Sequence, residues 1–271
     1  MIAARVARQT FLLLVCVASL YPIWFMVTTA LKTNEAYQLD PTGVPKHPTM
    51  HNFVETLRDL PVPHWLLNSV IVTASSIAIS TLIAMLGAYA IAFGAFPGRQ
   101  LLLKTNLVLL VIPPVTLLIP MFVLMVDVGW INSLRSVILF YSGLLIPFSI
   151  FFLVNFFGTV PPELIEAATV DGASPLYVLR RIVTPISAAA VFTLMVVNAI
   201  YVWNELLIAL VFLQDENKRT LMAGLTLFQG RYTTNQPLIL AGAFVSIVPV
   251  ILVYLSGQRF FVRGLTAGIG K

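Results

Sequence analysis

Charged side chains are scarce in this sequence. They make up 10% of its 271 residues, whereas a soluble domain carries about a quarter. Hydrophobic residues account for 59%, and a globule of this size has no interior large enough to hide such an excess from water. A lipid bilayer removes this difficulty. Because the apolar residues do not alternate strictly along the chain, an all-α membrane protein is favoured over a transmembrane β-barrel.

Residue types that bind metals or form disulfides are equally sparse. Cys16 is the single cysteine, which excludes a disulfide within the chain. The histidines His47, His51 and His64 fall in one predicted loop, where prolines on both sides of His47 argue against a helix. A metal site needs further well-placed ligands, so none is expected, and neither is a catalytic cluster. The net charge of +5 is too diffuse to indicate nucleic-acid binding.

Long apolar runs, by contrast, are abundant. A helix needs roughly 20 apolar residues to cross a bilayer, and about six runs meet that requirement. They are 10–31, 66–96, 103–126, 134–157, 186–213 and 238–256. The first follows Arg5 and Arg8 but continues without a small-residue cleavage site, so we interpret it as an uncleaved helix and not a signal peptide. Residues 1–271 are therefore predicted to form a single, multi-pass transmembrane domain.

Prolines interrupt several of these runs. Pro113, Pro114 and Pro120 fall within the third, and each removes a backbone donor and predicts a kink. Such kinks are typical both of irregular packing and of a pathway lined by bent helices. The concentration of prolines in the third run favours a functional role there.

Basic residues indicate how the chain is oriented. Both terminal segments and the loop after the second run carry arginine or lysine and no acid. Because cytoplasmic flanks are enriched in these residues, we expect both termini in the cytoplasm. The loop 161–185 would then be cytoplasmic, while 32–65 and 214–237 would lie outside.

The loop 161–185 carries helix-boundary signals. Pro161–Pro162 suits a helix start, and Glu166 lies in the early turns, where the helix dipole favours acid. Gly172 suits the end of that helix. Ser174 is typical of an N-cap, with Pro175 at the first position of a second helix. The loop is therefore predicted to be a helix–turn–helix that protrudes into the cytosol.

The spacing within this loop matches a known pattern. Glu166–Ala168 is followed after three residues by Gly172 and, after nine more, by Ile182–Pro185. This resembles the EAA loop of permease subunits of binding-protein-dependent ABC importers, with Thr184 where leucine is usual. Three further stretches resemble the carbohydrate, MalG-type branch of these importers. They are Phe96–Arg99, Trp203–Glu205 and the tail Gln258–Gly268.

The resemblance implies the bundle of a type I ABC importer permease and a division of labour. It implies a second permease subunit as heterodimer partner, two cytosolic ATPase subunits, an extracytoplasmic solute-binding protein and a prokaryotic inner membrane. The ATPase-coupling residues would be Glu166, Ala167, Ala168, Asp171, Gly172, Ile182 and Pro185. ATP and Mg would bind to the partner ATPases, since this sequence has no Gly-x4-Gly-Lys-Ser/Thr phosphate loop. The chain itself would be a transport subunit and not an enzyme, and its solute would be a sugar or a sugar-like compound.

Glu205 stands out as an acid inside a predicted span. Leaving it against lipid would cost roughly 2.5–3.5 kcal/mol, so it should face the protein interior or a wet cavity. With Trp203 and Asn204 it is a candidate for the solute path. A structural hydrogen bond between helices, assisted by Asn204 or Trp203, explains it equally well.

A stand-alone secondary transporter or channel is the alternative function. Secondary carriers often contain internal repeats with paired broken helices and ionisable residues near the midplane. No convincing repeat relates the two halves of this sequence. The importer subunit is therefore preferred.

Overall fold

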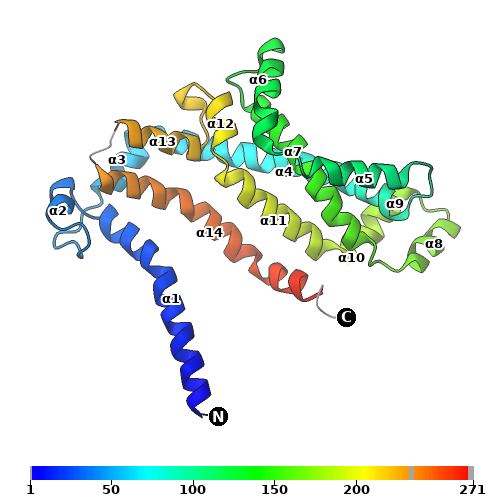
Figure 1. Ribbon diagram of the computed structural model, residues 1–271, viewed down its shortest axis with the longest axis horizontal. Helices are drawn as coiled ribbons and strands as arrows, with labels where there is room; N and C mark the ends of the chain where they lie inside the picture. The colour runs from blue at the N-terminus through cyan, green and yellow to red at the C-terminus, as the bar shows by residue number, and fades with distance from the viewer. Residues whose placement is uncertain (1, 232–234, 268–271) are drawn as a thin grey trace. The chain divides into compact units, whose positions relative to one another are not determined.

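The structure is a computed structural model that describes residues 2–231 and 235–267, with side chains described for 5–227, 235–252 and 254–255. Every regular element within these residues is a helix, as expected for an all-α protein (Figure 1). In chain order they are α1 (Ile2–Ala30), α2 (Asn34–Leu39), α3 (His51–Arg58), α4 (Val62–Phe93), α5 (Arg99–Leu109), η1 (Pro114–Leu117), α6 (Leu118–Asp127), α7 (Leu134–Phe157), α8 (Pro162–Val170), α9 (Pro175–Val178), η2 (Leu179–Val183), α10 (Thr184–Ile186), α11 (Ala188–Asn204), α12 (Leu207–Phe212), η3 (Glu216–Lys218), α13 (Leu221–Arg231) and α14 (Gln236–Ala267).

The chain divides into two compact units. The first contains α1, α2, α3 and α13, and the second contains everything from α5 to η3. Two long helices run through the division: α4 changes unit after Leu66 and α14 after Pro249.

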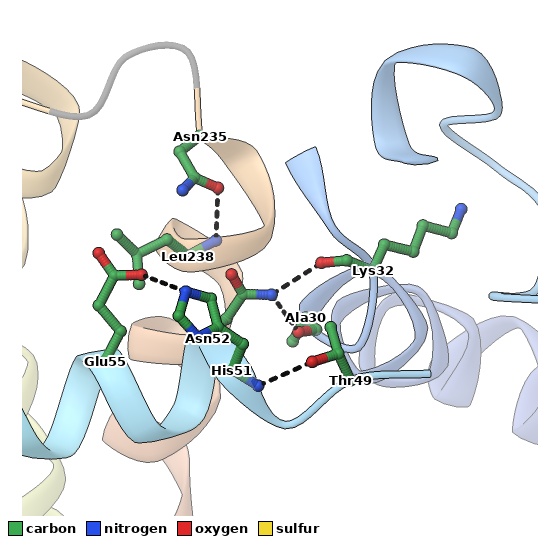
Figure 2. Close-up of polar contacts among 8 residues, drawn as sticks. All are labelled: Ala30, Lys32, Thr49, His51, Asn52, Glu55, Asn235 and Leu238. Atoms are coloured by element: carbon green, nitrogen blue, oxygen red, sulfur yellow. Dashed lines mark hydrogen bonds and ion pairs between the residues drawn. The ribbon is translucent and has the colours of Figure 1, made fainter. Parts of the chain in front are cut away.

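In the first unit, Asn52 on α3 forms hydrogen bonds with the backbone at the end of α1. Its amide nitrogen donates to the carbonyl oxygens of Ala30, at 2.7 Å, and Lys32, at 2.8 Å (Figure 2). The last carbonyls of a helix have no partner within it, so a buried side-chain donor is a direct way to satisfy them. His51, next along, places its ring 3.6 Å from the Glu55 carboxylate one helical turn later.

A buried tryptophan organises the core of this unit. Trp65 is buried together with Leu221 and Ala223 of α13 and Leu238 of α14. Gly224 on α13 faces the Trp65 ring so closely that a methyl group at this position would overlap ring carbons. The glycine is therefore required by packing, since its backbone is ordinary helix.

In the second unit, α4, α7 and α11 share one apolar core. Ala84 and Ala88 of α4 pack with Leu153 and Phe157 of α7 and with Leu194 of α11, and all are buried. The small residues on α4 let its backbone approach the other helices closely, as in other membrane bundles.

The third apolar run, 103–126, is not one helix as predicted. It divides into α5 and the η1–α6 segment, which are bent by 94° at the break. Pro113 adopts an extended conformation (φ −64°, ψ 132°), because a residue before proline avoids the α-region, and Pro114 then starts η1. The prolines therefore end the helix here and do more than kink it.

The fifth run, 186–213, is also divided. Residues Pro175–Ile186 and Ala188–Asn204 are bent by 82° at Ser187, and a second break separates α11 from α12 at Glu205. By contrast, α7 runs from Leu134 to Phe157 without a break, although Pro147 lies inside it.

Within residues 2–231 and 235–267, three helices are long and apolar enough to cross a membrane by themselves: Arg5–Ala30, Val62–Phe93 and Leu134–Phe157. The number becomes five when each bent pair is taken as one span. The sixth predicted run falls on α14, where Gln236–Leu252 is a shorter apolar helix. The side chains of the tail Gln258–Gly268 lie outside the described residues, as does all of 268–271.

Candidate functional site

The first half of the predicted cytoplasmic loop ends in a hydrogen-bonded glycine turn. Helix α8 ends at Val170 with Asp171 as its C-cap, and Gly172 follows with φ +79°. The Ala173 amide donates to the Ala168 carbonyl at 2.9 Å, and the Gly172 amide donates to Thr169 at 3.0 Å. These two bonds form a Schellman motif, which requires a left-handed residue after the helix and strongly prefers glycine there. The spacing from Ala168 to Gly172 in the sequence is the spacing of this motif.

The second half of the loop begins as its sequence predicts. Ser174 caps α9, since its hydroxyl accepts from the Tyr177 amide at 3.3 Å, and Pro175 occupies the first helical position. The helix–turn–helix is thereby confirmed. The helix then widens into a π-helical turn, η2, before α10. There the Thr184 hydroxyl donates to the Leu179 carbonyl five residues earlier, at 2.7 Å.

The base of the loop is built into the core of the second unit. Val178, Leu179 and Val183 are buried in the same apolar cluster as Leu153 and Leu194, which belong to α7 and α11. Ala168 and Ala173, on either side of the glycine turn, are partly buried and pack against this cluster. The loop is therefore continuous with the helices that carry it.

A hollow of about 650 Å³ with a mixed polar and apolar lining lies at the turn. It is lined by Ala168, Asp171, Gly172, Ala173, Ser174, Tyr177, Arg181 and Ile182. The structure thus brings together four of the residues predicted for coupling, whereas Glu166, Ala167 and Pro185 do not line the hollow. Tyr177 and Arg181 were not singled out from the sequence. Residues four apart on a helix lie on one face, so their spacing was the feature of the sequence that could have placed them together.

Glu166 projects from the exposed surface of α8. Within the residues whose side chains are described, no ion pair or hydrogen bond engages its carboxylate. Glu163 is a similar exposed acid in the first turn of the same helix. A free carboxylate on a protruding helix is available to a basic group or an amide of another protein.

Glu205 occupies the break between α11 and α12. Its carboxylate accepts from the amides of Leu207, at 2.9 Å, and Ile208, at 3.0 Å, which are the first free donors of α12. It also accepts from the hydroxyl of Tyr141 on α7, at 2.5 Å. One of the two explanations open from the sequence, a hydrogen bond between helices, is therefore present, and Tyr141 is the partner on the other helix.

Asn204, next in the same motif, is engaged within its own helix. Asn204 is exposed, and its amide donates to the Ile200 carbonyl of its own helix at 2.7 Å. Trp203 is half-buried. Asn204 and Glu205, although adjacent in sequence, therefore engage different partners.

A largely apolar cavity of about 350 Å³ lies beside the first helix break. It is lined by Leu109, Leu110, Ile112, Pro114, Leu144, Leu145, Pro147, Phe148, Val197, Asn198 and Tyr201. Asn198 is buried, and its side-chain amide donates to the Ser149 hydroxyl at 3.0 Å. Neither Glu205 nor its sequence neighbours line this cavity.

No group of three or more histidine, cysteine, aspartate or glutamate side chains could hold a metal ion among the described residues. The fold is shared with a solved bacterial transporter. Over 96% of both chains it matches a bacterial ABC transporter involved in the import of the acidic polysaccharide alginate, with a TM-score of 0.81 and 23% identity.

The family follows from the sequence comparison. The model of the binding-protein-dependent transport system inner membrane component matches residues 81–266, and the chain belongs to this family. It is 36% identical to the sulfoquinovosyl glycerol transport system permease protein SmoH of Agrobacterium fabrum, over 93% of this chain and 89% of that protein. It is 32% identical to the trehalose/maltose transport system permease protein MalG of Thermococcus litoralis, over 96% and 94% of the two chains. Family membership selects a transport permease subunit of the inner membrane over a stand-alone secondary transporter.

Proposed function

We propose that this chain is the membrane-spanning subunit of an ATP-driven importer and that loop 161–185 couples it to an ATPase. The observation that carries the proposal is the helix–turn–helix whose first helix ends in a Schellman motif. In this loop the Glu166 carboxylate is exposed and has no partner among the described side chains. At the base of the loop, Val178 and Val183 are buried in the apolar core of the bundle.

Coupling requires that a push on the loop reach the membrane helices. Close-packed interiors transmit displacement because they have few voids to absorb it. Leu179 and Val183 contact the cluster that also holds Ala84, Leu153 and Leu194. A displacement of α8 and its turn would therefore shift α4, α7 and α11 together. ATP and Mg would bind only to two partner ATPase subunits, as the sequence carries no phosphate loop.

The solute path would involve the two helix breaks. Irregular backbone at membrane depth is tolerated where it is buried in protein or lines a water-filled cavity. The break before Pro114 borders the 350 Å³ cavity, and the break at Glu205 is held by Tyr141. Since its carboxylate is already engaged, Glu205 would shape the path, leaving Trp203 and Asn204 as candidates for solute contact.

A sugar or sugar-like compound is the proposed solute. The names of the relatives from Agrobacterium fabrum and Thermococcus litoralis refer to sulfoquinovosyl glycerol and to trehalose and maltose. An extracytoplasmic binding protein would deliver the solute, and a second permease subunit would complete the pathway. The basic flanks support cytoplasmic termini in this arrangement.

The coupling role can be tested by replacing Glu166 with alanine. Losing a charge-assisted hydrogen bond of about 1.5–3 kcal/mol should weaken docking of the ATPase roughly 10- to 100-fold. The measurements are co-purification of the ATPase with the permease and ATP-driven sugar uptake into proteoliposomes. Glu163→Ala is the matched control, because it removes an exposed acid from the same helix. Wild-type co-purification and uptake by Glu166→Ala would overturn the coupling role.

A further inference from the structure

Lys32 is a buried lysine placed directly after the first span. Helix α1 ends at Ala30, and the Lys32 side chain is only 2% exposed. Its ammonium donates to the carbonyl oxygens of Asp40, at 2.6 Å, and Pro41, at 3.3 Å. An ammonium has three donors, and within the described residues no carboxylate lies in ion-pair distance of this one. A buried charge is normally paired, so this cation calls for an anion.

The position of this lysine is fixed by its neighbours. Asn52 holds the Lys32 carbonyl at 2.8 Å, while the Lys32 side chain extends away from Asn52 (Figure 2). On that side the ammonium meets the carbonyls that follow α2. The cation is therefore held in place before any ligand arrives.

A pocket of about 400 Å³ opens beside Lys32. A second lysine, Lys46, and His47 contribute to its lining. Asp40 is the acid in the lining, and its carboxylate accepts from the Gly43 amide at 2.9 Å without pairing with either lysine. Two lysines against one aspartate give the pocket a net positive charge that suits an anion.

The surroundings of the pocket are apolar, which indicates where the anion comes from. Leu39 and Val44 line the pocket and are 88% and 64% exposed. Tyr21 and Trp24, aromatic residues typical of a membrane interface, lie in the last turns of α1, with ring centroids 5.8 Å apart. Cations next to exposed apolar side chains at the end of a span are expected at the level of lipid headgroups.

We propose that this pocket binds the phosphodiester headgroup of an anionic phospholipid, with Lys32 and Lys46 as its cationic ligands. The phosphate oxygens accept from the free donor of the Lys32 ammonium and from Lys46. Leu39 and Val44 lie against the acyl region. The inference rests on the proposed function only in placing the end of α1 at a membrane surface.

The experiment is a lipid titration of the importer, purified with its partner permease and ATPase subunits and followed by native mass spectrometry. Dioleoylphosphatidylglycerol is compared with dioleoylphosphatidylcholine, which carries the same phosphodiester without net charge. Wild type retains phosphatidylglycerol preferentially. Lys46→Gln weakens that retention about fivefold, and Lys32→Met removes the preference.

Two controls separate the pocket from general effects. Arg58→Gln removes an exposed cation from α3 that does not line the pocket, and it leaves retention unchanged. Lys32→Met also removes a donor from two carbonyls that shape the loop, so the deciding comparison is wild type against Lys46→Gln, whose side chain is exposed. Equal retention by wild type and Lys46→Gln overturns the proposal.

A different occupant would give a different result. If Lys46→Gln weakens binding of the solute-binding protein and leaves phosphatidylglycerol retention unchanged, the pocket takes an acidic side chain of that protein and the lipid proposal is wrong. Failure of the proposed coupling shows separately, as wild-type uptake by Glu166→Ala. Should the ATPase not co-purify at all, the same lipid titration on the full chain alone still tests the pocket.

Discussion

The contact between Tyr141 and Glu205 gives the sharpest test of how the broken fifth span is held. Three donors converge on one carboxylate: the Tyr141 hydroxyl and the amides of Leu207 and Ile208. Tyr141 is 1% exposed, so water cannot replace its partner. Removing the Tyr141 hydroxyl and removing the Glu205 charge should therefore have effects on stability that depend on each other.

Two ranges of hydrogen-bond energy set the coupling energy expected between the two substitutions. A hydrogen bond to a charged group contributes about 1.5–3 kcal/mol in soluble proteins. Interhelical hydrogen bonds in membranes average about 0.6 kcal/mol, with a maximum near 1.7. For a short, charge-assisted contact we expect a coupling energy of about 1 kcal/mol between Tyr141→Phe and Glu205→Gln. The double variant should thus lose about 1 kcal/mol less than the sum of the single variants.

The assay is unfolding of the chain in mixed micelles by increasing SDS, followed by circular dichroism, for the two single variants and the double variant. Tyr89→Phe paired with Glu205→Gln is the matched control, because within the described residues no hydrogen bond engages the Tyr89 hydroxyl. That control cycle should show additive losses. Additive losses for Tyr141 and Glu205 as well would refute the idea that Tyr141 stabilises the break through this carboxylate.

Three further predictions concern glycines and a cap. Gly224→Ala should destabilise the first unit by about 1–3 kcal/mol, because its methyl group overlaps the Trp65 ring, whereas Gly143→Ala, with open space around it, should be neutral or stabilising in the same SDS titration. Gly172→Ala should cost about 1 kcal/mol at the positive φ of the turn, and should lower ATPase co-purification without reducing membrane insertion. Ser174→Ala removes a helix cap worth about 1 kcal/mol, and should speed amide hydrogen exchange in 175–178 while leaving the rest of the chain unchanged.

The structure of loop 161–185 was predictable because its determinants are local. The Schellman bonds join residues three and five positions apart, and the Ser174 cap joins residues three apart. Hydropathy likewise located α7, an uninterrupted run of the length that crosses a bilayer. In such segments a short stretch of sequence contains all the groups that interact.

The broken spans were only partly predictable. The prolines near Pro113 indicated a bend. The sequence predicted a kink within one helix, whereas in the structure the helix ends and the chain turns by 94°. The break at Glu205 was missed altogether. Its partner on the neighbouring helix, Tyr141, is 64 residues away in the sequence, and the nearby amides that it accepts from, those of Leu207 and Ile208, lie in an apolar run that indicated one continuous helix.

The π-helical turn η2, which lies in the second half of loop 161–185, has a consequence for the angular register of this chain. A π-turn accommodates one residue more than an α-turn, so each side chain before it is rotated about 100° relative to an uninterrupted α-helix. Deleting one residue within Leu179–Val183 would rewind this turn and swing Tyr177 around the helix axis. A single-residue deletion would thus re-aim the surface around Tyr177 while leaving its composition almost intact, which separates the direction of loop 161–185 from its chemistry.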